Sequence, residues 1–201
     1  MVFFFVCQSD PNVIIYMGKD KYENEELIKF AWHDVDVWFH VEDLSSAHVY
    51  LRLPAPVESL SEISDDVVQE CAQLTKANSI EGCKKHSVGI NYTWAKNLKK
   101  TIGMQVGAVS FHSTKEVQRI SIDKDKEIVK KVMKTKTESF PDLELEYRDH
   151  LEALKVAKSA ALREVIKEKK EAEKAKKVEQ EEKKQEMREF EQAQEGLETS
   201  N

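Results

Sequence analysis

The chain has 201 residues, of which 34% are charged and 40% hydrophobic, and its formal net charge at pH 7 is -6. With a mean hydropathy of -0.58, this composition is too polar for one compact globule of this length. Apolar and polar runs alternate up to Ile122, whereas Glu, Lys and Ala dominate from Asp123 onward. The sequence therefore predicts a globular domain over residues 1–122 followed by a charged segment.

Cysteine usage and the N-terminus bear on the cellular compartment. Cys7, Cys71 and Cys83 form no CxxC pair, so the sequence suggests neither a disulfide framework nor a zinc knuckle, and a reducing compartment fits. The opening apolar run is too short for a signal peptide or a membrane span and indicates a first strand. We therefore expect a soluble protein of the cytoplasm or the nucleus, although hydropathy gives no information on peripheral membrane association.

Residues 1–122 alternate between strand and helix patterns. Two β-rich runs flank a Ser-Asp-Pro turn and predict a hairpin, and a segment with helical spacing follows them. The predicted strands are residues 2–7, 12–17, two runs within 36–54, 87–94, 107–112 and 116–122, and the predicted helices are 21–32 and 64–82. Their sum is an α+β domain with a largely antiparallel sheet and flanking helices.

The charged segment is predicted to be helical. Residues 123–141 form a helical connector that Pro141 interrupts, because proline removes an amide donor. Residues 142–201 form a coiled-coil-like helix rich in Glu and Lys, with i,i+4 pairs such as Glu173 and Lys177. Charged residues interrupt its heptad seam, so the coiled coil is weak. Its C-terminal end is expected to be disordered.

The stretch DVWFHVEDLSSAHVYLRLP, residues 36–54, carries two histidines in facing strands. Alternate side chains of a strand face opposite sides, and the odd positions from Val37 to Leu53 are apolar and define the core face. The even positions form a second face that is aromatic and polar. The expected partners across the hairpin are Asp36 and Arg52, Trp38 and Tyr50, and His40 and His48.

Three interpretations of this second face remain open. It packs under a helix as a second core layer, it forms a stacking platform for nucleobases, or its histidines bind a metal. Two histidines supply only half of a tetrahedral zinc shell, and no Ser or Cys lies in a nucleophile motif. A metal-dependent hydrolase is thus retained only because of the histidine pair, and the sequence predicts no enzyme activity, no metal and no cofactor. In the platform interpretation, histidines protonated at low pH add a phosphate contact.

The span from Gly82 to Lys115 contains no Asp or Glu. It holds lysines interleaved with aromatic residues, a combination that suits a phosphate backbone and unstacked bases. The alternative is an ordinary hairpin with a Lys-rich solvent face. The candidate nucleic-acid-binding residues of both stretches are Trp38, His40, His48, Tyr50, Arg52, Lys84, Lys85, Tyr92, Trp94, Lys96, Lys99 and Lys100.

Residues 1–140 resemble the NFACT-R domain family. The resemblance is carried by the segments GKDKYENEELIKFAW, DVWFHVEDLSSAHVYLRL and CAQLTKANSIEGCKKHSVGINYTWAKNLKKTIGMQVGAVSF. Within them, the motifs that recur in order are Trp38-x-His40, Ala47-His48-Val49 and Tyr92-Thr93 leading to Asn97-Leu98-Lys99-Lys100. The resemblance implies an RNA-binding domain found in ribosome-associated quality-control factors that engage tRNA and the large ribosomal subunit. It points to Trp38, His40, His48 and the pair Lys99 and Lys100.

These observations predict a non-enzymatic nucleic-acid-binding protein. The resemblance favours RNA, tRNA or the ribosome as the partner, while stacking and phosphate contacts would serve DNA as well. Residues 142–201 are expected to contact a protein partner. The alternative function is an interaction adaptor in which this tail is the functional part and the domain binds protein.

Overall fold

The computed structural model describes the backbone of residues 1–198 and every side chain up to Val178. The chain divides into two units, Met1–His150 and Leu151–Asn201. The first unit therefore extends beyond the boundary expected at Ile122, because the segment after it supplies further elements to the same fold.

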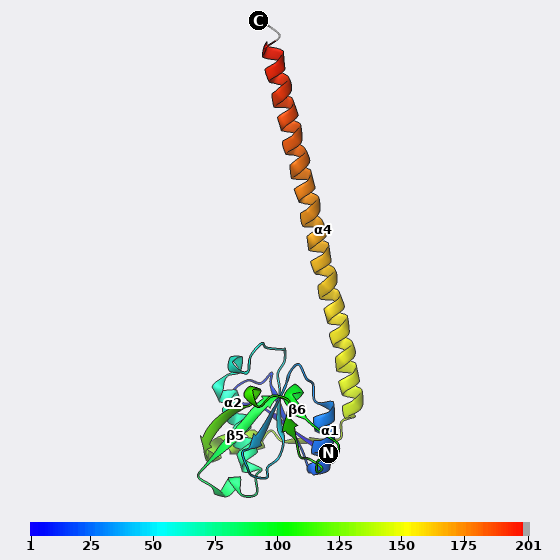
Figure 1. Cartoon of the computed structure of the whole chain (residues 1–201). Coiled ribbons are helices and arrows are strands. Elements are labelled where there is room, and N and C mark those ends of the chain that lie inside the picture. Colours follow the sequence, from blue (N-terminus) through cyan, green and yellow to red (C-terminus); the bar gives the residue numbers. More distant parts are fainter. Residues whose placement is uncertain (199–201) are drawn as a thin grey trace. The chain divides into compact units, whose positions relative to one another are not determined.

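A seven-stranded antiparallel sheet in the order β8-β5-β3-β4-β2-β1-β9 is the centre of the first unit (Figure 1). Its strands are β1 Val2–Val6, β2 Ile14–Gly18, β3 Asp36–Val41, β4 Val49–Arg52, β5 Ser87–Trp94, β8 Gln118–Asp123 and β9 Thr137–Ser139. A separate pair joins β6 Leu98–Lys99 to β7 Ser110–Phe111. The helices of this unit are α1 Lys21–Phe30, α2 Asp65–Ala77 and α3 Lys126–Met133, and α4 Leu143–Glu198 begins in it. The predicted α+β fold with a largely antiparallel sheet is confirmed.

The pairing of β3 with β4 follows the predicted register. Asp36 lies opposite Arg52 and Trp38 lies opposite Tyr50. Because side chains alternate along a strand, a shift by one residue would exchange the apolar face for the polar one. The apolar odd positions therefore specify this register.

The face formed by the odd positions packs against α2. Phe39 and Leu51 on the sheet, and Cys71 and Leu74 on α2, belong to one buried hydrophobic cluster. Full burial of each large apolar side chain contributes about 1.5–3 kcal/mol. This layer is the main core of the domain.

The even-numbered face of the same strands is a second core layer. Trp38 is 2% exposed and Tyr50 is 0% exposed. The residues that cluster with them come from α1, β6 and nearby segments: Val2, Tyr16, Leu27, Ala31, Ala95 and Leu98. A nucleobase cannot stack flat on rings with so little exposed surface. Of the three interpretations of this face, packing as a second core layer is therefore the one that fits Trp38 and Tyr50.

The predicted helical connector over residues 123–141 contains a strand as well as a helix. α3 packs on α2, and β9 then pairs with the free edge of β1. The side chains of β9 are exposed, so its three residues carry no apolar alternation from which the strand could be predicted. The strand predicted at 107–112 shortens to Ser110–Phe111.

The second unit consists of the part of α4 that follows His150. Lys177 Nζ lies 2.8 Å from Glu173 Oε1, which confirms the predicted i,i+4 pair. The disorder expected at the C-terminal end concerns residues beyond those whose side chains are described. Over residues 1–198, no helix combines the length and the apolar character that crossing a bilayer requires.

Candidate nucleic-acid interface

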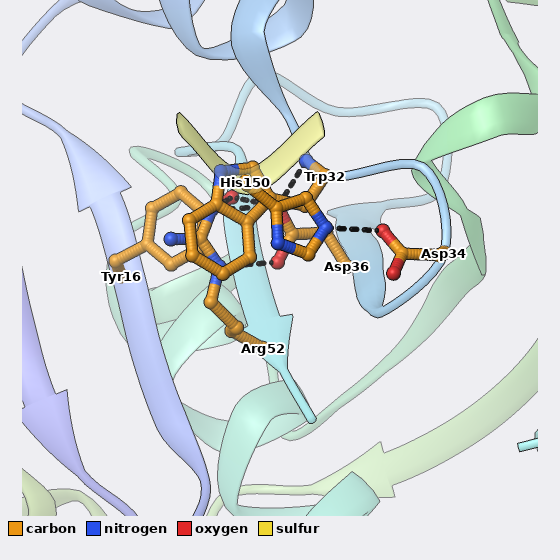
Figure 2. A network of polar contacts seen from close by, with 6 residues as sticks. All are labelled: Tyr16, Trp32, Asp34, Asp36, Arg52 and His150. Carbon is orange, nitrogen blue, oxygen red and sulfur yellow. Dashed lines mark hydrogen bonds and ion pairs between the residues drawn. The ribbon is translucent and has the colours of Figure 1, made fainter. Parts of the chain in front are cut away.

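Arg52 is held in a buried polar network rather than at a binding surface (Figure 2). Its Nε and Nη2 donate to the two carboxylate oxygens of Asp36, each at 2.8 Å. The same carboxylate accepts from the Tyr16 hydroxyl and the Trp32 amide, both at 2.6 Å. Burial is the largest single effect and lowers the pKa of Arg52, but the hydrogen bonds and charge interactions with Asp36 and Tyr16 together outweigh it, so the pKa is raised overall. Because the guanidinium already donates two hydrogen bonds to the Asp36 carboxylate, Arg52 is not placed to bind phosphate.

Three of the other predicted residues of the hairpin, Trp38, His40 and His48, line a cavity of about 300 Å³, the histidine cavity. Tyr50 does not line it and is fully buried in the second core layer. Its wall includes Trp38, His40, Asp43, His48, Asn91 and Phe111. The rings of Trp38 and His40 are parallel within 2° at 5.4 Å, and His48 stands at 80° to Trp38. The histidine rings are 5.2 Å apart. Among the described residues, no group of three His, Cys, Asp or Glu side chains converges to hold a metal ion.

The two histidines of this cavity are neutral at physiological pH. Burial lowers the pKa of His48 to about 3, and the positive charges of His40 and Lys100 act in the same direction. Burial also lowers the pKa of His40. The expectation that protonated histidines add a phosphate contact at low pH is therefore wrong for His48, because its imidazole stays neutral in moderately acidic solution.

Three of the predicted residues, Tyr92, Trp94 and Lys96, line a second hollow of about 420 Å³ at the end of β5, the aromatic groove. Lys115 also lines it. Tyr92 stacks on Phe39 at 5.2 Å with the planes 8° apart, and it is half-buried. Lys96 Nζ lies 5.7 Å from the centre of the Trp94 ring. The groove therefore combines a supported aromatic ring with two exposed lysines.

The remaining candidate lysines of the acid-free span, which is the span from Gly82 to Lys115 without Asp or Glu, do not line this groove. Lys84 and Lys85 are exposed before the start of β5, which separates them from Lys96 by the length of the strand, about 25 Å at 3.3 Å per residue. Lys99 is exposed in β6. Lys100 donates to Glu25 Oε2 at 2.7 Å and to two loop carbonyls at 2.9 Å, so it holds a loop in place. The span is therefore not one continuous basic patch.

Several residues of these sites, among them Lys115, Asn91 and Asp43, were not among the candidates from the sequence. Lys115 lies in the acid-free span, which was the signal that could have found it, and it reaches the groove from the 3-10 turn Thr114–Glu116. Asn91 reaches the histidine cavity because β5 pairs with β3, which places it opposite His40. Such a pairing between distant strands is not encoded in any local pattern.

The chain matches the family model described as NFACT protein RNA binding domain over residues 1–113. It is 49% identical over 175 residues to coiled-coil domain-containing protein 25 of Bos taurus, covering 85% of this chain and 82% of that protein. It is 29% identical over 118 residues to the Rqc2 homolog RqcH of Streptococcus pneumoniae serotype 2, covering 59% of this chain and 20% of that protein.

Among solved structures, the chain resembles the C-terminal part of the fibronectin/fibrinogen-binding protein from Streptococcus suis. The TM-score is 0.54 and the identity 22%, and the alignment covers 67% of this chain and 48% of that chain. This likeness concerns the fold, and the match spans about half of the solved chain. The family match covers more than half of the sequence and the bovine relative most of it, so the chain belongs to the family of the NFACT protein RNA binding domain.

Proposed function

We propose that this protein binds single-stranded RNA through the aromatic groove and catalyses no reaction. The carrying observation is that Tyr92, Trp94, Lys96 and Lys115 line one hollow of about 420 Å³ in a chain that belongs to a family described as RNA binding. Exposed lysines beside aromatic side chains are a usual arrangement for binding the backbone and the unstacked bases of a single strand.

The geometry supports a division of roles within the groove. Tyr92 is stacked on Phe39 and partly exposed in the groove. A base can contact the exposed part of its ring, and a base stacked on an aromatic side chain contributes about 1–3 kcal/mol. Lys96 and Lys115 are exposed and are placed to contact the phosphates. Glu58 and Glu116 also line the groove. They would repel a phosphate on their side and favour the amino group of a base.

The chemistry of the buried groups supports binding without catalysis. Burial raises the pKa of Cys7 to about 11, and it raises the pKa of Cys71. Neither thiol is therefore a ready nucleophile at neutral pH. A His48 pKa of about 3 makes this imidazole a weak base.

Association of this domain with the ribosome belongs to the same proposal, and the similarity to the Rqc2 homolog RqcH supports it at the level of the family. The proposed location is the cytoplasm. DNA remains a competing ligand, because phosphate contacts and stacking do not depend on the 2′-hydroxyl.

A second candidate function is that of an interaction adaptor acting through α4. Exposed apolar side chains recur along its described part, at Leu151, Val156, Leu162 and Val165. Apolar groups on a charged helix are contact points for a protein partner.

Titration of binding against salt concentration tests the RNA proposal on the full chain. Replacing Lys96 and Lys115 by Glu should weaken binding to single-stranded RNA and flatten the log-log salt slope by about 1.4, since each phosphate contact on a single strand contributes about 0.7. Lys167→Glu with Lys170→Glu makes the same change of charge on exposed positions of α4 and should leave the slope unchanged.

The same titration with DNA of identical sequence measures the preference for RNA. Thermal melting of each variant checks that the domain remains folded. If the Lys96 and Lys115 variant binds RNA with wild-type affinity and slope, the aromatic groove is not the RNA site.

A further inference from the structure

Two residues of the histidine cavity, Trp38 and His48, each contain a buried polar atom without a protein partner. Trp38 Nε1 and His48 Nδ1 are buried, and neither makes a hydrogen bond to any described residue. The side chains are 2% and 5% exposed. A buried polar atom without a hydrogen-bond partner is unfavourable, so both nitrogens favour a molecule that supplies one.

The accessible wall of the cavity offers polar groups of both kinds. His40 and Asn91 are partly exposed and can donate or accept, while Asp43 is exposed and can only accept. Asp43 has a φ of 54°, a left-handed conformation that Asp adopts more readily than most residues and that suits its place in the turn after β3.

The charge of this wall selects against phosphate. The pKa of His48 is about 3 and that of His40 is lowered, so both rings are neutral at pH 7 and attract no anion. The Asp43 carboxylate would repel one. A neutral, planar heterocycle with donors and acceptors on its edge meets all of these conditions.

We propose that the histidine cavity binds the edge of one unpaired nucleobase, with the sugar and phosphate outside the cavity. The choice of a nucleobase among neutral heterocycles rests on the RNA binding proposed above. The volume of about 300 Å³ lies at the lower end of small-molecule sites. His40, Asn91 and Asp43 would meet the edge of the base first.

Gly107, Ala108, Val109 and Phe111 supply a further part of the cavity wall. Trp38 Nε1 and His48 Nδ1 are covered in the free domain, so a base contacts them only when the atoms that cover them move. Phe111 stands edge-on to Trp38 at 5.7 Å. Gly107 has a φ of 80°, which permits a sharp turn at the start of the wall.

The histidine cavity and the aromatic groove lie on opposite faces of the sheet. Asn91 lines the cavity and Tyr92 lines the groove, and consecutive residues of a strand face opposite sides. The two sites can therefore be observed separately. The three tryptophans of the chain serve as reporters: Trp38 for the cavity, Trp94 for the groove and Trp32 as a reference.

Titration of the 15N-labelled full chain with each of the four ribonucleosides tests the cavity, read from the indole N–H signals. Trp94→Phe and Trp32→Phe assign two signals and leave the third to Trp38. We expect at least one nucleoside to shift the Trp38 signal saturably. Ribose 5-phosphate, which has no base, should leave it unchanged. An equal response to ribose 5-phosphate would overturn the proposal, as would an unchanged Trp38 signal at the solubility limit of all four nucleosides.

A plugged cavity gives the second test. Ala108 belongs to the cavity wall, and Ala108→Met adds volume there without removing a polar group. It should weaken the nucleoside response at Trp38 about tenfold, equivalent to about 1.4 kcal/mol, and leave Trp94 unaffected. Ala161→Met on α4 is the matched control. Wild-type affinity in Ala108→Met would overturn the proposal.

The pattern of shifts separates this inference from the proposed function. A response at Trp94 alone supports the aromatic groove and overturns the cavity. A response at Trp38 alone supports the cavity, and the salt titration with RNA then decides the groove.

Discussion

His150 stacks on Trp32 with the ring centroids 3.8 Å apart and the planes 6° apart (Figure 2). His150 Nε2 also lies 2.7 Å from Asp34 Oδ1. Arg52 lies 3.7 Å from the centre of the same indole ring, so Trp32 links the buried Arg52 network to His150. The first two turns of α4 therefore belong to the domain, although the composition of the sequence changes well before them.

This contact predicts different effects for two truncations. Removing residues 151–201 should leave the stability of the domain almost unchanged, whereas removing residues 143–201 should lower the free energy of unfolding by about 1–3 kcal/mol. The larger loss is expected because an aromatic stack and the packing of Leu143 disappear. Urea denaturation of both truncated chains measures the difference, and equal stabilities would mean that His150 contributes nothing.

Arg52→Ala should destabilise the domain rather than weaken RNA binding. The substitution leaves the fully buried Asp36 carboxylate without its charged partner, and loss of one member of a buried pair costs about 3–5 kcal/mol. The salt slope of RNA binding, measured at a temperature where the variant is folded, should equal that of the wild type. A flattened slope with unchanged stability would instead place Arg52 in the binding surface.

The sequence predicted what depends on local periodicity. The alternation from Val37 to Leu53 defined the core face and the register of β3 with β4, both of which the structure confirms. It left open what covers Trp38, because that depends on α1 and β6, which pack there from distant parts of the chain. β9 was missed for the same reason, since its pairing with β1 depends on backbone groups.

For the candidate binding residues too, the composition of the sequence predicted one part of the result and the fold determined the rest. The span without Asp or Glu contains Tyr92, Trp94 and Lys96, and the structure places these three residues in one groove. This span could not separate Lys100 from Lys99, because the partner of Lys100 is Glu25, far away in α1. Charge patterns indicate which residues can bind phosphate, but only the fold determines which of them are already paired.

Lys99 and Lys100 should therefore respond differently to substitution. Lys100→Met removes the bonds from Nζ to Glu25, Gln105 and Ala108, which should loosen the loop and accelerate hydrogen exchange at the Gly107 amide. Lys99→Met changes an exposed side chain of the same type and should leave that exchange rate unchanged. Equal rates in both variants would contradict a structural role for Lys100.

The free energy of unfolding of the domain should decrease as the pH decreases, and His48 should account for part of this decrease. Its pKa is lowered to about 3 in the folded domain, mainly by burial, whereas an unfolded histidine titrates near 6.5. Below about pH 6.5 the unfolded chain binds a proton that the folded chain does not, so the free energy of unfolding decreases by about 1.4 kcal/mol per pH unit as the pH falls towards 3. Between about pH 7 and pH 5, the free energy of unfolding of the wild type should therefore decrease by about 2 kcal/mol more than that of His48→Gln. Denaturation of both proteins at the two pH values measures this difference. His86→Gln is the control, because it makes the same substitution at a side chain that is 85% exposed and lies outside the histidine cavity. If His48→Gln lost as much stability as the wild type, His48 would have to bind a proton in the folded domain. This result would contradict the conclusion that the histidines of the cavity wall are neutral.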